Sequence, residues 1–139
     1  MMKKRVLFLC THNSCRSQMA ESLMNHYLGD RFEAFSAGTE ATGVNRLAVQ
    51  VMAETGIDIS GQRSKTLDEF DDQPFDYVVT LCGDANENCP LFVGGVERMH
   101  VGFDDPSRTT GSEEEIMAEF RRVRDEIKVW QLKQFGGLQ

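Results

Sequence analysis

The sequence has few of the features on which membrane and secreted proteins depend. Its longest apolar run, Val6 to Leu9, ends after four residues, whereas a membrane-spanning helix needs about 20. The basic start Met1-Met2-Lys3-Lys4-Arg5 is not followed by a hydrophobic segment of signal-peptide length. We therefore expect a cytoplasmic protein without a membrane partner, in which the cysteines are reduced.

Positive charge is scarce as well. The chain has 15 Lys and Arg residues against 22 Asp and Glu residues, which gives a net charge of -7. Nucleic acids and anionic membranes are bound by clustered basic side chains, so we expect no nucleic-acid partner. The same net charge repels an anionic substrate unless a strong local site attracts it.

The four cysteines do not have the spacing of a zinc site. Zinc proteins favour close pairs such as Cys-x2-Cys, whereas Cys10 and Cys15 are separated by four residues and Cys82 and Cys89 by six. A zinc or redox-sensing module is therefore a weak alternative, which the absence of stoichiometric zinc from the purified protein would exclude. We predict no bound metal and no bound cofactor.

Hydrophobic patterning predicts an α/β fold. Strands are expected at residues 4–9, 31–37, 75–81 and within 95–101, and helices at 19–27 and 44–52. A long final helix should start at Ser112, because Glu115 completes a capping box. Its expected buried stripe is Ile116, Phe120, Val123, Ile127 and Trp130. This alternation predicts a three-layer αβα architecture with a central four-stranded parallel sheet, in one domain spanning residues 1–139.

Several reactive residues directly follow the predicted strands. Cys10 follows the first strand, Cys82 the third, and Asp104-Asp105-Pro106 the fourth. Parallel sheets bind ligands outside the carboxyl ends of their strands. These residues are therefore expected at one edge of the sheet, although they are far apart in sequence.

Residues 10–17, which we call the anion loop, have the features of an oxyanion site: Cys10-Thr11-His12-Asn13-Ser14-Cys15-Arg16-Ser17. A loop between a strand and a helix directs backbone N–H groups and the helix dipole at one point, where they attract an anion. Arg16 can grip two oxygens of a tetrahedral anion, and Cys10 can act as a thiolate nucleophile. Ser17 can donate to that thiolate or to a leaving group, and Asn13, which tolerates left-handed turns, can hold the loop.

Simpler interpretations exist for each residue of the loop. Cys10 could be a buried strand-end cysteine and Arg16 a surface charge, but the spacing Cys-x5-Arg-Ser at a strand-to-helix junction favours the functional interpretation. For Cys15 we favour a packing role, since free cysteine behaves as a small buried hydrophobe. For His12 we favour a solvent-facing position over an electrostatic tuning role.

The anion loop resembles the phosphate-binding loop of the low-molecular-weight protein tyrosine phosphatase fold, and the resemblance extends over roughly residues 4 to 135. That fold carries its general acid in an Asp-Pro loop near the last strand. The resemblance implies that Asp105 protonates the departing oxygen, whereas Asp104 does not precede Pro106 and is the weaker candidate. The alternative for Asp105 is a turn aspartate before a proline.

A second segment, Cys82-Gly83-Asp84-Ala85-Asn86-Glu87-Asn88-Cys89-Pro90, follows the third predicted strand. Together with the anion loop and Gln18, it resembles the thioredoxin-coupled arsenate reductases. The resemblance implies that Cys10 attacks arsenate and that Cys82 forms a Cys10–Cys82 disulfide as arsenite leaves. Cys89 then forms a Cys82–Cys89 disulfide, which thioredoxin reduces. Oxidation of two thiols to one disulfide supplies the two electrons that reduction of As(V) to As(III) requires.

A tyrosine phosphatase is the alternative function. It explains the anion loop and Asp105 but leaves Cys82 and Cys89 without a role. It also prefers aromatic residues after the Asp-Pro pair, where this chain has Ser107-Arg108-Thr109. We expect a monomer with weak phosphatase side activity. Thioredoxin is favoured over glutaredoxin as the reductant, because the internal cysteine pair removes the need for a glutathione adduct.

Some members of the arsenate reductase family hold a potassium ion near the anion loop. Asn13, Glu21 and Ser36 match that site, whereas Arg63 and Lys65 fall where neutral or acidic ligands are expected. A Lys65 ammonium could occupy the cation position and pair with Glu21, so we predict little potassium dependence. The alternative is that Arg63 and Lys65 are solvated surface charges.

The interval between Cys82 and Cys89 adds a geometric expectation. If residues 83–89 are helical in the reduced protein, the two Cα atoms lie about 10.5 Å apart along the helix axis. A disulfide tolerates roughly 7 Å at most. The segment must therefore unwind when the second disulfide forms.

Overall fold

The computed structural model describes residues 2–82 and 95–137 of the chain. Cys89 and the helix predicted at residues 83–89 lie outside these ranges, so both remain predictions. Within the described ranges, no helix combines the length and the apolar character that crossing a membrane requires.

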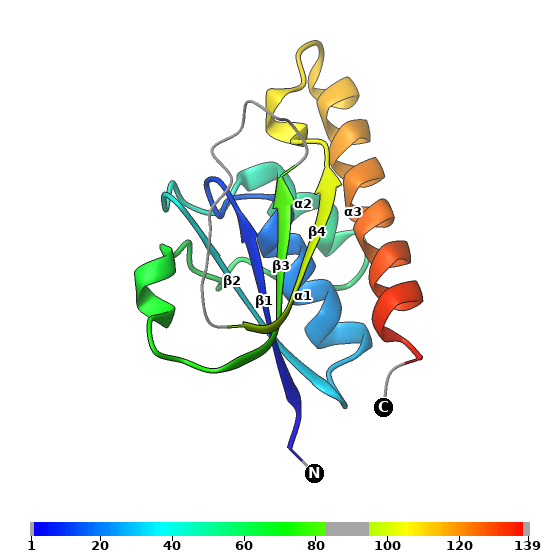
Figure 1. Ribbon diagram of the computed structural model, residues 1–139. Helices are drawn as coiled ribbons and strands as arrows, with labels where there is room; N and C mark the ends of the chain where they lie inside the picture. The colour runs from blue at the N-terminus through cyan, green and yellow to red at the C-terminus, as the bar shows by residue number, and fades with distance from the viewer. Residues whose placement is uncertain (1, 83–94, 138–139) are drawn as a thin grey trace.

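Four parallel strands form the predicted sheet, in the order β2-β1-β3-β4 (Figure 1). They are β1 (Lys4–Cys10), β2 (Phe32–Gly38), β3 (Phe75–Cys82) and β4 (Gly95–Phe103). The central strand β1 contains the short apolar run, Val6 to Leu9, and all four of these side chains are fully buried, as a strand covered on both faces requires. Because every pairing is parallel, all four carboxyl ends lie at one edge, at the top of Figure 1.

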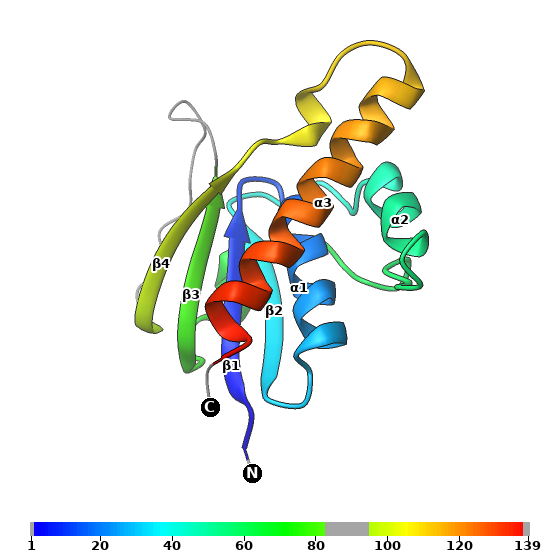
Figure 2. The same cartoon turned by 90° about the vertical axis from the view of Figure 1, so that its right-hand side faces the viewer.

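The helices form layers on the two faces of this sheet. The α-helices α1 (Arg16–Tyr27), α2 (Arg46–Ala53) and α3 (Glu113–Phe135) lie together on one face (Figure 2). The 3-10 helix η1 (Leu67–Phe70) packs on the other face against Leu7 and Leu9. The three-layer α/β architecture predicted from the sequence is confirmed.

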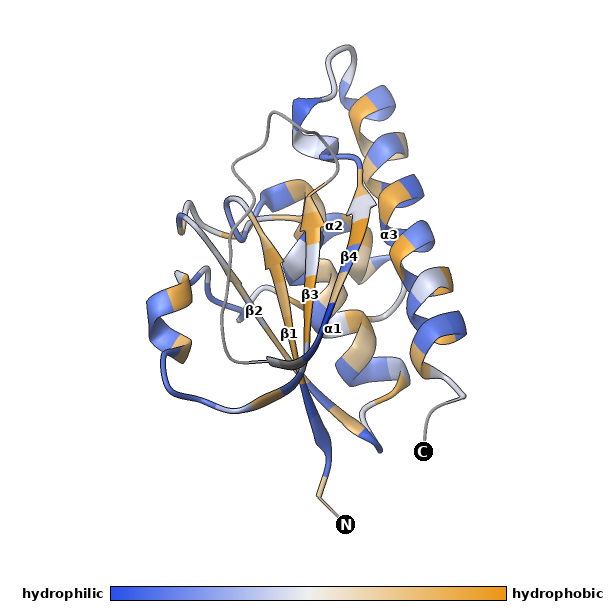
Figure 3. Ribbon diagram, in the orientation of Figure 1, coloured by the Kyte–Doolittle hydropathy of each residue, from blue (hydrophilic) through white to orange (hydrophobic). Residues whose placement is uncertain are grey.

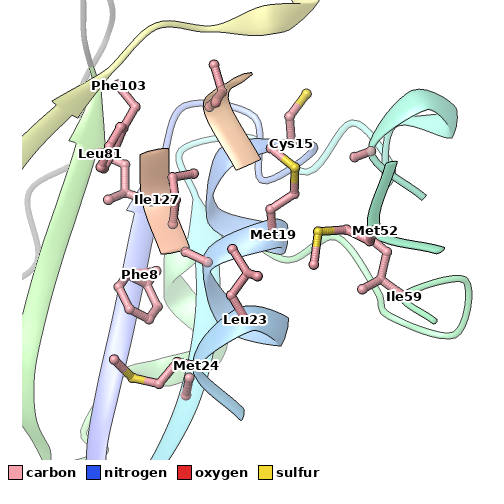
Figure 4. Close-up of a cluster of buried hydrophobic side chains, with 14 of the residues drawn as sticks. Phe8, Cys15, Met19, Leu23, Met24, Met52, Ile59, Leu81, Phe103 and Ile127 are labelled. Atoms are coloured by element: carbon pink, nitrogen blue, oxygen red, sulfur yellow. The ribbon is translucent and has the colours of Figure 1, made fainter. Parts of the chain in front are cut away.

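The larger of the two cores lies between the sheet and α1, α2 and α3. Figure 4 shows Phe8 of β1, Leu81 of β3 and Ile127 of α3 on the sheet side of this core, with Met19 and Leu23 of α1 nearby. In the hydropathy colouring, most of β1 and β3 is apolar, whereas the helices carry both polar and apolar residues (Figure 3). The fold therefore rests on a packed apolar interior between the sheet and these helices.

The long helix α3 starts as predicted, with the Ser112 capping box completed by Glu115. Phe120, Val123 and Ile127 are buried, and Ile116 and Trp130, at the two ends of the predicted stripe, are partly buried and pack against the same core. Trp130 lies edge-on to Phe103 of β4 and to Phe135, so its ring covers the rim of the core. Periodicity places a residue on a helix face, but it does not show where the sheet beneath that face ends.

Candidate active site

The anion loop connects the end of β1 to α1, and its turn is held by Asn13. Asn13 adopts the left-handed conformation, with φ of 50°, as its residue type allows. Its side-chain Oδ1 accepts hydrogen bonds from the Lys65 backbone N–H at 2.7 Å and from Gln18 Nε2 at 2.8 Å. The Ser64 hydroxyl donates to the Asn13 carbonyl oxygen at 2.9 Å. The loop is therefore held in place by hydrogen bonds from residues 64 and 65 and from Gln18 of α1.

The last residue of β2 leaves no space beneath the loop. A Cβ atom at Gly38 would lie 2.8 Å from the Asn13 backbone nitrogen and 2.8 Å from the carbonyl oxygens of Cys10 and Thr11. Separations this short are not tolerated between these atoms, and all three belong to backbone that cannot rotate away. Only glycine allows β2 and the anion loop to approach this closely.

A hydrogen-bond chain ends at the predicted nucleophile. The Cys10 Sγ lies 2.8 Å from the Ser17 Oγ, and Asn13 Nδ2 donates to the same Oγ at 2.8 Å. Asn13 fills one acceptor position of the hydroxyl, so the Ser17 oxygen can either donate its hydrogen to the Cys10 sulfur or accept one from the thiol. All three side chains are buried. The predicted nucleophile therefore lies in direct contact with a hydroxyl group that a neighbouring amide orients.

Arg16 lies where two strand ends meet. Its side chain is 2% exposed, and Nη1 donates to the carbonyl oxygens of Leu81 at 3.5 Å and Phe103 at 3.2 Å. Its Nη2 lies 3.6 Å from Asp105 Oδ2. The guanidinium is thus anchored to the ends of β3 and β4 beside the loop, and the interpretation of Arg16 as a surface charge is wrong.

Asp105 caps a turn and also faces the anion loop. Its Oδ1 accepts from the backbone N–H of Ser107 at 3.0 Å and from the Ser107 hydroxyl at 2.6 Å, which caps the short helix η2 (Pro106–Arg108). Its Oδ2 faces Arg16, and its side chain is 6% exposed. Asp104 points away, with a side chain that is 74% exposed. The carboxyl group that faces the anion loop is therefore that of Asp105.

Cys82 ends β3, the strand that pairs with β1. Leu9 is level with Thr80 in this pairing, so Cys82 lies one residue beyond the level of Cys10 at the same sheet edge. Cys10, Cys15 and Cys82 are buried thiols in this structure. The structure therefore brings Cys10, Arg16, Ser17, Cys82 and Asp105 to one edge, and Cys89 lies outside the described residues.

The other two predicted loop residues differ in environment. Cys15 is buried in the core near Met19 (Figure 4), and burial raises the pKa of its thiol to about 12. It therefore remains protonated at neutral pH, as a packing role requires. The His12 side chain is 38% exposed, and its Nε2 lies 3.4 Å from Glu40 Oε2, which agrees with a solvent-facing position.

The residues that match the potassium site form a buried ionic cluster. Glu21 Oε1 accepts from the Ser36 hydroxyl at 2.7 Å, and Lys65 Nζ lies 3.8 Å from the same oxygen. Burial raises the pKa of Glu21 and lowers the pKa of Lys65, while the charge of each opposes the shift of the other. Lys65 also donates to the carbonyl oxygen of Arg63 at 2.7 Å. Lys65 thus pairs with Glu21 as predicted, whereas the Arg63 side chain is an exposed charge paired with Glu69.

Apart from Asn13, sequence patterning did not find the supports of the site. Gly38, Ser64 and Gln18 hold the loop, and Arg122 of α3 binds Asp104 beside the predicted acid. These contacts join segments far apart in the chain, so hydrophobic periodicity contains no signal for them. The clearest local sign was a glycine at the carboxyl end of a predicted strand.

Comparison with known proteins finds matches to one phosphatase family and to arsenate reductases. The family model described as low molecular weight phosphotyrosine protein phosphatase matches residues 5–135. An arsenate reductase of Halalkalibacterium halodurans is 57% identical over 127 residues, which cover 91% of each chain. A structure of an arsenate reductase in the phosphate binding state has a TM-score of 0.82 at 32% identity and covers 98% of this chain and 99% of that chain. A thioredoxin-dependent arsenate reductase of Corynebacterium glutamicum has a TM-score of 0.60 at 31% identity and covers 95% of this chain and 64% of that chain.

Proposed function

This chain belongs to the low molecular weight phosphotyrosine protein phosphatase family, and from that premise we propose that it is a thioredoxin-dependent arsenate reductase. Its relatives include arsenate reductases that match almost the whole chain. The thioredoxin dependence of one structural neighbour supports thioredoxin as the source of electrons. Arsenate is a tetrahedral oxyanion like phosphate, so the anion loop of this family suits it.

The observation that carries the proposal is the position of Arg16 at the sheet edge. The guanidinium contacts the strand ends that lead to Cys82 and to Asp105, and it lies in the loop that begins with Cys10. A nucleophile, an acid and a second thiol are thereby gathered around one anion-binding group. A phosphatase needs the first two, but only a reductase uses the third.

The first step forms a sulfur–arsenic bond. The Cys10 thiolate, stabilised by the Ser17 hydroxyl, attacks the arsenic atom while Arg16 holds the equatorial oxygens. One arsenate oxygen leaves as water after it receives a proton from Asp105. Arsenic is still As(V) at this point, because bond formation and water loss transfer no net electrons to it.

The second step is the reduction. The Cys82 thiolate attacks the Cys10 sulfur, and the sulfur–arsenic bond breaks with its electron pair on arsenic. Arsenite, As(III), leaves, and a Cys10–Cys82 disulfide remains. Cys89 then attacks Cys82, which releases the Cys10 thiolate and forms a Cys82–Cys89 disulfide. Two thioredoxin thiols reduce that disulfide by exchange, and the enzyme returns to its starting state.

The cavity beside the anion loop has no aromatic contact to offer a phenyl ring among the described residues that line it. A cavity of about 390 Å³ beside the loop is lined by His12, Ser14, Thr42, Gly43, Val44, Asn45 and Ser107. Among the described residues that line it, none is Phe, Tyr or Trp, so a phenyl ring finds no aromatic partner there. Hydrolysis of aryl phosphates is therefore expected only as a weak side activity.

Cysteine variants test the proposal directly. Wild type should turn over arsenate repeatedly with thioredoxin, thioredoxin reductase and NADPH. Cys89→Ser should stop after about one arsenite per enzyme, because the Cys10–Cys82 disulfide is no longer resolved. Cys10→Ser should produce no arsenite. Arsenite counted against enzyme concentration in a rapid-quench assay separates these outcomes.

Assays of Cys82→Ser with a phosphatase substrate and with arsenate distinguish a reductase from a phosphatase. Cys82→Ser should retain p-nitrophenyl phosphate hydrolysis, which needs Cys10 but no relay, and should lose arsenate reduction. A wild-type protein that hydrolyses the aryl ester rapidly and releases no arsenite with thioredoxin would contradict the proposal. Cys15→Ala, which changes a buried core thiol, is the matched control and should behave as wild type in both assays.

A further inference from the structure

Two adjacent aspartates after β4 point in opposite directions. Asp105 Oδ2 faces Arg16 at 3.6 Å, whereas Asp104 Oδ2 accepts from Nη2 of Arg122 at 2.9 Å. The backbone at Asp105 is extended, and successive residues of an extended chain project to opposite sides. A contact that fixes the Asp104 carboxylate on the α3 side therefore also limits where the Asp105 carboxyl group can point.

Arg122 is itself held in place along α3. Its Nη1 donates to Glu126 Oε2 at 2.9 Å, and its Nη2 donates to Glu119 Oε2 at 2.6 Å. These carboxylates come from the helical turns before and after Arg122, so the guanidinium is oriented before Asp104 binds it. A planar guanidinium held in this way fixes the orientation of the carboxylate that it binds, in addition to neutralising its charge.

The chain just before Asp104 is fixed to the same helix. The Phe103 ring lies edge-on to Trp130 of α3, with ring centroids 6.2 Å apart. The Phe103 carbonyl oxygen accepts from Arg16 at 3.2 Å. Asp104 is thus the last point at which α3 holds the chain before the Asp-Pro turn begins.

We propose that Arg122 and Asp104 are positioning residues, which hold the Asp105 carboxyl group in the orientation needed to protonate the departing oxygen. This inference rests on the proposed role of Asp105 as the general acid. Neither Arg122 nor Asp104 touches the substrate. Their contribution is geometric, since small displacements of a reacting group cost large factors in rate.

Opposite charge changes separate this role from long-range electrostatics. Arg122→Gln removes a positive charge near the site, and Asp104→Asn removes a negative one. If the pair acts through its field, the two variants should shift turnover in opposite directions. If it acts by holding the chain, both should lower turnover.

The test is arsenate turnover with thioredoxin for Arg122→Gln, Asp104→Asn and the double variant. Each single variant should lower kcat by roughly three- to tenfold, because an exposed ion pair contributes modestly but the acid that it positions is sensitive to displacement. KM for arsenate should change little, since the anion loop is untouched. The double variant should have a kcat no lower than that of either single variant. Arg122→Lys should have a kcat between those of Arg122→Gln and wild type.

The pH dependence of kcat distinguishes positioning of the acid from a purely structural role, which would leave the pH profile unchanged. The decline of kcat on the alkaline side reports loss of the catalytic proton, and it should flatten in Arg122→Gln and Asp104→Asn. Arg121→Gln is the matched control, because Arg121 is the neighbouring arginine of α3 and binds Glu54 instead of Asp104. It should lower stability without a change in the pH profile.

Failure of this inference is distinguishable from failure of the proposed function. If wild type releases no arsenite, the function is wrong, and the pair is then judged from p-nitrophenyl phosphate hydrolysis, where Asp105 would protonate the phenolate. Opposite shifts in the two single variants, or equal losses in Arg121→Gln, would overturn the inference. A crystal structure of Arg122→Gln with Asp105 still facing Arg16 at about 3.6 Å would overturn it whatever the activity.

Discussion

At the scale of single residues, two equally buried cysteines of one loop differ in their surroundings. Cys10 lies at the end of a hydrogen-bond chain, whereas burial raises the pKa of Cys15 to about 12. We expect Cys15→Ala to keep arsenate turnover within about twofold and to lower the free energy of unfolding by about 1 kcal/mol, since it removes one buried sulfur. Steady-state assays and urea unfolding at pH 7 measure both effects.

The sign of the pH dependence follows from the direction of that shift. A thiol whose pKa is raised in the folded state stabilises the fold below its ordinary value of 9.0 and loses that contribution as the pH rises toward 12. The stability difference between wild type and Cys15→Ala should therefore shrink above pH 9. A constant difference across this range would count against protonated burial.

Lys65 provides the second test at this scale. Its ammonium lies 3.8 Å from Glu21 Oε1, at the cation position that the sequence resemblance predicts. We expect wild-type turnover to be the same in potassium and sodium, and Lys65→Gln to be stimulated several-fold by potassium, because the variant leaves the Glu21 carboxylate without its cation. Arg63→Gln, which removes an exposed charge nearby, should show no such response. A several-fold effect of potassium on wild-type turnover would refute the prediction that the Lys65 ammonium takes the place of the potassium ion.

At the scale of elements, the end of β2 determines the shape of the anion loop. Gly38→Ala would place a methyl group 2.8 Å from three backbone atoms of the loop, so the loop must shift. We expect kcat/KM for arsenate to fall by roughly 100-fold or more, since a displacement near 1 Å costs about that factor. Phosphate binding, measured by calorimetry, should weaken together with turnover.

Gly61→Ala is the matched control for this prediction. A Cβ atom at Gly61 has no neighbour within 4 Å among the described residues, so the substitution adds a methyl group without a collision. It should leave kcat/KM unchanged. Equal losses in both variants would mean that glycine content, and not the contact beneath the loop, causes the effect.

The elements also show which parts of the fold the sequence could predict. Within residues 2–82 and 95–137, the four strands and three α-helices were expected close to their observed bounds, because apolar patterning reflects burial directly. The start of α1 was placed at residue 19, three residues late, since Arg16, Ser17 and Gln18 are polar yet buried beneath the loop. Periodicity does not detect polar residues that are buried for function.

The reactive residues of the site and one support, Asn13, were predicted from the sequence, whereas the other supports were not. Cys10, Arg16 and Asp105 come together as expected, because parallel topology brings strand ends to one edge. The contact between Arg122 and Asp104 could not be predicted, since it depends on the rotation of α3 about its axis. Arg122 and Asp104 are 18 residues apart in the sequence, and an acidic chain contains many other pairs of opposite charges at similar spacings, so the sequence does not single this pair out.

At the scale of the whole molecule, an acidic protein must bind an anion. The net charge is -7, so the attraction must come from the buried guanidinium of Arg16 and the backbone N–H groups at the start of α1. Most surface carboxylates with perturbed pKa values are paired with arginines or capping groups, and their pKa values are lowered. Glu21 is shifted in the opposite direction, because it is buried. The surface therefore favours the folded state at neutral pH and loses that contribution in acid.

Glu54 makes this acid sensitivity testable, because it joins two helices. Hydrogen bonds from Arg121, and then from Arg124, hold the pKa of Glu54 below its ordinary value of 4.5, and both arginines belong to α3 while Glu54 ends α2. A lowered pKa gives stability that is present above pH 4.5 and lost as the pH falls through the folded value. We expect Glu54→Gln to lower the free energy of unfolding at pH 7 by about 1 kcal/mol, a modest figure because the pair is partly exposed.

The difference between Glu54→Gln and wild type should shrink as the pH falls below 4.5, where protonation of Glu54 produces the same loss in wild type. Urea unfolding at several values between pH 3.5 and pH 7 measures it, with Glu33→Gln, a change at an exposed residue of β2, as the control. A difference that stays constant with pH would mean that the amide disturbs packing between α2 and α3. A difference that grows in acid would reverse the assigned sign and remove Glu54 from the causes of acid unfolding.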